Sequence, residues 1–183
     1  MSPEVELWLV RHGQTEWNAD GKVCGWFDAA LTEHGRQQAR SLRGFLSAHE
    51  FVDVWSSDLS RAVETARLAL GPARADARLR EFHFGDVEGL IWHDLDPAVR
   101  DRILEFEGFR APNGEDMAAF RRRVYEFVDH LSPGRHLLFV HAGLIRLLLR
   151  AVDNDQFLPP ASVAGLEWTR RKFLFIREGC PAV

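Results

Sequence analysis

Apolar and polar positions along this chain alternate between two patterns, and the first is typical of strands. Residues 5–10 form a nearly continuous apolar run, as in strands that are buried on both faces of a sheet. Shorter runs at 52–55 and 137–140 predict two further buried strands. Two more strands are expected at 162–168 and 172–177, near the end of the sequence.

The second pattern is the three- and four-residue spacing of amphipathic helices. One such helix is predicted after Thr32, which can act as its N-cap, and another after residues 58–60, where Asp58 or Ser60 can do so. A mostly apolar helix is predicted at 144–152.

A further helix is predicted from the spacing of five apolar residues that share one face, and Pro133–Gly134 should end it. These five residues are Met117, Phe120, Val124, Phe127 and Leu131.

The stretch from about 82 to 118 interrupts the alternation and is rich in Gly, Asp and aromatic residues, with a helix expected within 97–107. We interpret it as a short excursion that covers the substrate. Its Trp92, Phe106 and Phe109 either line a lid over the site or only pack the excursion. Alternating strands and helices predict an α/β fold, a three-layer αβα sandwich with a mostly parallel central sheet. Without repeats or a low-complexity linker, residues 1–183 are interpreted as a single domain.

Composition narrows the class of protein. The 183 residues are 46% apolar and 27% charged, which is typical of globular proteins. Lys and Arg total 23 against 27 Asp and Glu, and this net charge of −4 argues against a nucleic-acid partner. The sequence shows no export signal and no apolar stretch of membrane-spanning length, so we expect no membrane partner and a cytoplasmic location. Cys24 and Cys180 carry no disulfide framework.

Candidate chemistry lies where the predicted strands end. Residues 9–13 read Leu-Val-Arg-His-Gly and residues 139–143 read Phe-Val-His-Ala-Gly, so His12 and His141 each follow a strand. Arg11 precedes the first histidine, and Arg61 falls in the first turn of a helix, where free N–H groups favour an anion. Because ligands bind at the carboxyl edge of such sheets, we expect these four residues to share one phosphate-sized site.

Five segments together resemble the histidine phosphatase superfamily, which includes the cofactor-dependent phosphoglycerate mutases. The segments are Arg-His-Gly-Gln-Thr-Glu-Trp-Asn at 11–18, Gly-Trp-Phe-Asp at 25–28 with Leu-Thr at 31–32, Ser-Ser-Asp-Leu-Ser-Arg-Ala at 56–62, Leu-Arg-Glu at 79–81 with Phe-Gly-Asp at 84–86, and His-Ala-Gly at 141–143. The resemblance implies a phosphoglycerate mutase-like fold.

The same resemblance implies roles for individual residues. His12 would be the nucleophile, Arg11, Arg61 and His141 would form the phosphate pocket, and Glu81 would be the general acid and base. The chemistry is self-consistent: a neutral imidazole can attack phosphorus, while arginines and a protonated His141 neutralise the transferring group.

Other residues near these motifs leave alternatives open. Glu88, seven residues after Glu81, is a second candidate for the acid. Gln14, Asn18 and Gly25 are expected to bind the substrate, although Asn18 is nearly as well explained as a loop cap.

Two charged clusters are interpreted as solvated surface, so no metal and no cofactor is expected. The first comprises His83, His93, Asp94 and Asp96, and the second Arg121, Arg122 and Arg123.

The expected function is hydrolysis of a small phosphorylated metabolite through a phosphohistidine. A phosphoglycerate mutase is the first alternative, and an inactive phosphate-binding module is the second. Mutase-like members usually have His-Gly-Asn where this chain has His-Ala-Gly at 141–143, and Ser or Thr where it has Cys24. They also carry a more cationic middle segment, whereas this chain has no lysine between 22 and 172. Residues 82–89 and 112–115 resemble α-ribazole phosphatases.

Overall fold

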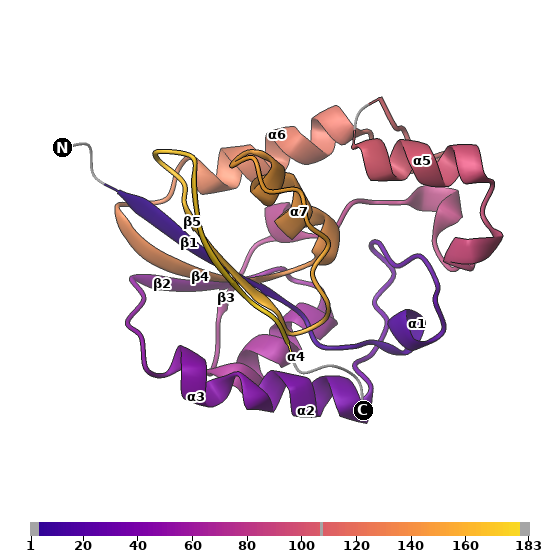
Figure 1. Cartoon of the computed structure of the whole chain (residues 1–183). Helices are drawn as coiled ribbons and strands as arrows, with labels where there is room; N and C mark the ends of the chain where they lie inside the picture. Colours follow the sequence, from indigo (N-terminus) through magenta and orange to yellow (C-terminus); the bar gives the residue numbers. More distant parts are fainter. Residues whose placement is uncertain (1–3, 107, 180–183) are drawn as a thin grey trace.

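The computed structural model describes residues 4–106 and 108–179, which form a six-stranded sheet in the order β3-β2-β4-β1-β5-β6 (Figure 1). The strands are β1 (Val5–Arg11), β2 (Asp53–Ser56), β3 (Arg74–Ala75), β4 (Gly134–Val140), β5 (Val163–Glu167) and β6 (Lys172–Arg177). Strands β3, β2, β4 and β1 are mutually parallel, whereas β5 is antiparallel to β1 and β6 is antiparallel to β5. The predicted mostly parallel sheet is therefore confirmed.

Helices cover both faces of the sheet, as Figure 1 shows. The α-helices are α1 (Glu16–Ala19), α2 (Glu33–Ser41), α3 (Arg43–Leu46), α4 (Ser60–Ala69), α5 (Pro97–Glu105), α6 (Met117–Val128) and α7 (Ala142–Arg150). Three short 3-10 helices are η1 (Ala77–Leu79), η2 (Gly85–Val87) and η3 (Trp92–Asp94).

Strand β1 separates the two apolar cores. Its Leu7 and Leu9 pack with side chains of α6 and α7 on one face, whereas Trp8 and Val10 pack with Leu42 and with side chains of α3 and α4 on the other. All four are nearly or fully buried because alternate side chains of a strand point to opposite faces. The predicted three-layer sandwich is confirmed.

The two predicted N-caps have different outcomes. The Thr32 hydroxyl accepts a hydrogen bond of 2.9 Å from the backbone N–H of Gly35, as expected. At α4 the prediction is wrong, because Asp58 instead pairs with Arg80 and Ser60 is the first helical residue. The carboxylate of Asp28, from a distant loop, accepts from both the backbone N–H and the hydroxyl of Ser60.

Helix α6 follows its predicted apolar face, with Met117, Phe120, Val124 and Phe127 buried. It ends at Val128, a full turn before the Pro–Gly pair. Between η1 and α6 the chain leaves the sheet edge through η2, η3 and α5, which confirms a helix within the predicted excursion. In the part of the chain that the structure describes, no helix is both long and apolar enough to span a bilayer.

Candidate active site

Strands β1, β2 and β4 are parallel, so their carboxyl ends lie at one edge of the sheet. Arg11 is in register with Val140, and the backbone N–H of His12 donates to the carbonyl of Val140 at 3.0 Å. His141 follows β4 and is the N-cap residue of α7, while Arg61 lies in the first turn of α4. The fold therefore directs both histidines and both arginines to the same edge.

The two imidazoles face one another, with ring centroids 5.2 Å apart and planes inclined by 62°. Nδ1 of His12 lies 2.7 Å from the carbonyl oxygen of Gly13, which only accepts, so this nitrogen carries the proton. Nε2 consequently holds the lone pair. Burial and the charges of Arg61 and Arg11 keep the pKa of His12 well below its usual value, so the ring is neutral at physiological pH.

His141 differs from the expected protonated state. Burial, followed by the charge of Arg61, lowers the pKa of His141 well below its ordinary value. With only protein groups around it, the ring is therefore neutral. Both of its ring nitrogens are buried and have no hydrogen-bond partner among the described residues. A phosphate dianion beside the ring would supply a partner and would raise its pKa.

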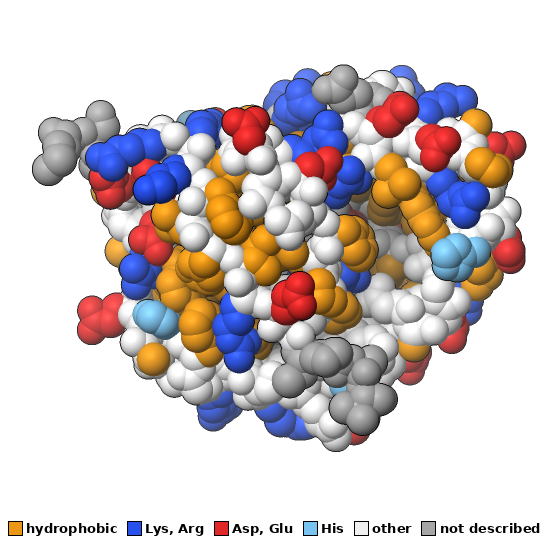
Figure 2. Space-filling view, in the orientation of Figure 1, with side chains coloured by type: hydrophobic (Ala, Val, Ile, Leu, Met, Phe, Trp, Pro, Cys, Tyr) orange, Lys and Arg blue, Asp and Glu red, His pale blue; other side chains and the backbone are white. Residues whose placement is uncertain are grey.

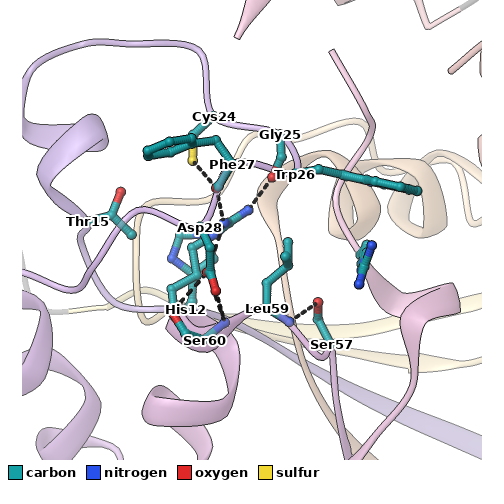
Figure 3. A network of polar contacts seen from close by, with 12 residues as sticks. His12, Thr15, Cys24, Gly25, Trp26, Phe27, Asp28, Ser57, Leu59 and Ser60 are labelled. Carbon is teal, nitrogen blue, oxygen red and sulfur yellow. Dashed lines mark hydrogen bonds and ion pairs between the residues drawn. The ribbon is translucent and has the colours of Figure 1, made fainter. Parts of the chain in front are cut away.

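Both arginines are held by backbone carbonyls, and Figure 3 shows the loop whose Gly25 and Phe27 carbonyls bind Arg61. Nη2 and Nη1 of Arg61 donate to the carbonyls of Gly25 and Phe27, at 2.6 and 2.9 Å. Nη1 of Arg11 donates to the carbonyl of Leu158 at 2.5 Å. Burial lowers the pKa of Arg11 to about 10, which leaves it charged at neutral pH. The buried Nε atoms of both arginines have no partner among the described residues, so an anion would complete their hydrogen bonding.

Glu81 lies beside this cluster, with its carboxylate bound at the start of α7. Its Oε2 accepts from the backbone N–H of Gly143 at 2.8 Å and its Oε1 from that of Phe82 at 2.9 Å. Burial raises the pKa of Glu81, although the two N–H donors and the nearby arginines oppose the shift. A raised pKa lets a carboxyl keep its proton to a higher pH, which favours a role as general acid.

Arg123 is a residue of the site that the sequence pattern did not indicate. Arg121 and Arg122 are exposed as expected, but the interpretation is wrong for Arg123, whose side chain is only 16% exposed. Its guanidinium donates to the carbonyls of Arg80 and Glu81 at 2.7 and 2.8 Å and is paired with a carboxylate of Glu115. It therefore fixes the backbone that carries the candidate acid.

The expected substrate-binding residues have different places. Gln14 and Asn18 line the cavity next to His12. Their side-chain oxygens are engaged, with Thr32 and the backbone N–H of Thr15 respectively, so a ligand would meet their NH2 groups. The loop-cap interpretation of Asn18 therefore accounts for its side-chain oxygen, whereas the substrate-binding interpretation concerns its NH2 group. Gly25 is not a lining residue, and its carbonyl binds Arg61 instead.

A cavity of about 760 Å³ opens in front of the cluster, and Figure 2 shows its hollow with hydrophobic side chains along the margin. Arg11, His12 and Glu81 line its inner end. The outer wall is mainly apolar and comes from the excursion and the loop after α7; it includes Phe84, Trp92, Ile103, Leu104, Phe106 and Phe157. Two of the three expected lid aromatics thus face the cavity, whereas Phe109 is packed in the core.

Cys24 also lines the cavity, and burial raises the pKa of its thiol. Cys180, the other cysteine, lies outside the described residues. Across residues 4–106 and 108–179, no group of three or more His, Cys, Asp or Glu side chains is placed to hold a metal ion.

Comparison with known proteins places this geometry in context. Residues 7–179 match the family model described as histidine phosphatase superfamily (branch 1). The adenosylcobalamin/alpha-ribazole phosphatase of Salmonella typhimurium is 37% identical, with 96% of this chain and 88% of the relative aligned. A 2,3-bisphosphoglycerate-dependent phosphoglycerate mutase of Gloeobacter violaceus is 34% identical over 88% and 80% of the two chains. The crystal structure of a phosphoglycerate mutase from Thermus thermophilus is 44% identical, covers 93% of this chain and 97% of its own, and superposes with a TM-score of 0.87.

Proposed function

This chain belongs to the histidine phosphatase superfamily, and on that premise we propose that it hydrolyses small phosphomonoesters through a phosphohistidine on His12. The choice of hydrolysis over phosphoryl transfer rests on the charge of the cavity wall. The roles of the site residues are part of the proposal.

In the first step the Nε2 lone pair of His12 attacks phosphorus, a nitrogen–phosphorus bond forms, and the phosphorus–oxygen bond to the alcohol breaks. In this proposal the oxygens of the phosphoryl group bind the nitrogens of Arg11, Arg61 and His141 that are buried and have no partner among the described residues. Glu81, with its raised pKa, gives its proton to the departing alkoxide, so the alcohol leaves neutral.

In the second step a water molecule attacks phosphorus from the side that the alcohol has left. Glu81, now a carboxylate, takes a proton from that water. The nitrogen–phosphorus bond breaks, inorganic phosphate leaves, and His12 returns to its neutral form with Nδ1 still bonded to Gly13. Over the two steps the phosphoryl group passes from the alcohol to water, and Glu81 regains the proton that it gave to the alcohol.

Among the described residues, the cavity wall offers no free cation for a second anionic group of the substrate, as a mutase would need. Apart from Arg11, its described Lys and Arg side chains are Lys22 and Arg146. Lys22 pairs with Asp20 at 2.8 Å, and Arg146 binds both carboxylate oxygens of Asp155 at 2.6 and 3.0 Å. Because both cations are already paired with carboxylates, a substrate whose phosphate is its only anionic group is favoured over a phosphoglycerate, which also carries a carboxylate.

The apolar outer wall favours a substrate whose alcohol carries a large, weakly charged body. Such a body would displace water from the rings of Phe84, Trp92 and Phe157, which stabilises binding by about 25 cal/mol for each Å² covered. The phosphatase names among the relatives agree with this proposal, since the Salmonella protein is named as an adenosylcobalamin/alpha-ribazole phosphatase.

Mutase activity is the second candidate, because relatives named as phosphoglycerate mutases match this chain about as well as the phosphatases do. One experiment separates the two. We would incubate the enzyme with 3-phosphoglycerate and its bisphosphorylated cofactor, and in parallel with 1-naphthyl phosphate and glycerol phosphate, and measure free phosphate and 2-phosphoglycerate. We expect phosphate release that is fastest from the naphthyl ester. Rapid formation of 2-phosphoglycerate with little free phosphate would establish the mutase, and phosphate binding without turnover would indicate an inactive module.

A further inference from the structure

Glu88 was the second candidate for the acid. Both of its carboxylate oxygens accept hydrogen bonds from backbone N–H groups. Oε1 accepts from the N–H groups of Trp26 and Phe84, at 2.9 and 3.1 Å, and Oε2 accepts from the N–H of Phe27 at 2.7 Å. The side chain is only 11% exposed, and Glu88 is not among the residues that line the cavity. Glu88 is therefore buried outside the cavity wall.

The peptide group between Gly25 and Trp26 joins this carboxylate to Arg61. Its N–H donates to Glu88 Oε1, and its C=O accepts from Nη2 of Arg61 at 2.6 Å. In a trans peptide the N–H and C=O point in opposite directions, so the planar group lies between the carboxylate and the guanidinium. Figure 3 shows the loop from Gly25 to Asp28, with the hydrogen bonds that its carbonyls accept drawn as dashed lines.

Phe27 makes a second connection, which runs through two consecutive peptide groups rather than one. Its backbone N–H donates to Glu88 Oε2, and its carbonyl accepts from Nη1 of Arg61 at 2.9 Å. Both terminal nitrogens of Arg61 are thus bound to carbonyls of one loop, and Glu88 fixes that loop from the other side. The arrangement requires glycine at position 25, because a Cβ there would lie 2.3 Å from Glu88 Oε1.

We propose that Glu88 is a positioning residue that orients the Arg61 guanidinium toward phosphate through the Gly25–Phe27 backbone. A carboxylate that accepts from an amide N–H polarises the amide and strengthens the bond made by its carbonyl. Arg61 has no hydrogen-bonded carboxylate of its own among the described residues, and the nearest ion pair is with Asp28 at 3.9 Å. The proposal rests on the phosphate site of the proposed function but not on the choice between hydrolysis and transfer.

The first test is the affinity for inorganic phosphate, measured by calorimetry without turnover. In Glu88→Gln one acceptor oxygen becomes an NH2 group that faces a backbone N–H, so the loop loses a bond and the negative charge. We expect phosphate binding to weaken by about tenfold. The matched control is Glu167→Gln, whose side chain is 9% exposed, accepts the backbone N–H of Arg170, and lies at the opposite end of β1. The control should bind phosphate as the wild type does.

The second test asks whether Glu88 acts through Arg61. In an Arg61→Lys background the two carbonyl bonds cannot both be made in the same geometry, so Glu88→Gln should cost less than about twofold there. An equal cost in both backgrounds, or an unchanged phosphate affinity in Glu88→Gln alone, would overturn the proposal. If Glu88→Gln does not fold, Glu88→Asp keeps the charge but shortens the reach, and its phosphate affinity should fall as well; wild-type affinity in Glu88→Asp would equally overturn the proposal.

The third test separates positioning from acid catalysis. Glu88→Gln should slow alkyl and p-nitrophenyl phosphates by the same factor, because orientation of Arg61 matters for both leaving groups. Selective loss of alkyl phosphate turnover would instead identify Glu88 as the acid and overturn the proposal. If the wild type binds phosphate and responds to Glu88→Gln but does not hydrolyse esters, only the proposed function fails.

Discussion

Glu81 is hydrogen-bonded through Oε2 to the backbone N–H of Gly143, two residues beyond His141, at 2.8 Å. The contact joins the segment after η1 to the first turn of α7 and places the candidate acid at the same sheet edge as the two histidines. Because burial raises its pKa, the carboxyl at this position holds its proton to a higher pH than an ordinary glutamate does. The candidate acid is therefore held at the helix whose N-cap residue is His141.

The leaving group should reveal the role of Glu81. Glu81→Gln cannot protonate an alkoxide, so turnover of an alkyl phosphate should fall by about 10² to 10⁴. Turnover of p-nitrophenyl phosphate, whose leaving group needs no proton, should fall far less. The decline of kcat/KM with rising pH should also disappear, because the ionisation of Glu81 causes it. Equal losses for both substrates would contradict an acid role.

Substitution of His12 should remove the covalent intermediate. In His12→Ala we expect no detectable turnover and no acid-labile radioactive phosphoenzyme after incubation with a labelled ester, because the side chain contributes the only nitrogen that attacks phosphorus in the proposed mechanism. A useful comparison is His130→Ala, since His130 is an exposed residue at the end of α6 and should label as the wild type does. Full activity in His12→Ala would refute covalent catalysis.

Gly143→Ala should damage catalysis more than folding. A Cβ at this position would lie 2.5 Å from Glu81 Oε1, the far end of a flexible side chain that can move away. We expect kcat to fall by about tenfold or more, while inorganic phosphate still binds. Gly44→Ala is the matched control, because a Cβ added at this position of helix α3 would have no neighbouring atom within 4 Å. It should raise the free energy of unfolding by about 0.5–1 kcal/mol and leave kcat unchanged.

Stability should depend on pH through the buried histidines. The unfolded chain takes up protons on His12 and His141 below about pH 6.5, whereas their folded pKa values lie well below this. The free energy of unfolding should therefore fall as the pH drops below 6.5, by at most about 1.4 kcal/mol per pH unit for each imidazole. Glu81, with a raised folded pKa, acts in the opposite direction at lower pH. Urea titrations between pH 7.5 and 5.5 should show a flatter dependence in the His12→Asn, His141→Asn double variant, and an unaltered slope would contradict this account.

Asp155 should control the affinity for doubly anionic substrates. Its carboxylate pairs with Arg146 and Arg150, and these pairs hold its pKa below the usual range. Asp155→Asn would free the charge of Arg146 on the cavity wall, so KM for 3-phosphoglycerate should fall by about three- to tenfold. KM for 1-naphthyl phosphate, which has no carboxylate, should not change. A parallel fall for both esters would show that Asp155 acts on the shape of the cavity instead.

The predictable part of the site is the part that sheet geometry dictates. His12 and His141 each follow a buried apolar run, and parallel strands end at one edge, so their proximity follows from the pattern alone. The roles of Arg123 and Asp28 could not be predicted in this way. Hydrophobic periodicity reports which face of a helix is buried, but it does not report how far an arginine at the margin of that face can reach. Likewise, local sequence does not show that Asp28 will cap a helix that begins 32 residues later.

The position of β4 between β1 and β2 has a consequence for how the protein acquires activity during synthesis. Residues 134–140 supply the hydrogen bonds to both neighbours, and β1 and β2 do not pair with each other in the folded sheet. While the chain emerges from a ribosome, its first 130 residues therefore leave both edges of β1 and one edge of β2 without their partners, and they lack His141. Such edges are prone to association with other chains. In the proposed mechanism, which uses His141, turnover requires this last part of the chain, so regained turnover during refolding would report completion of the sheet.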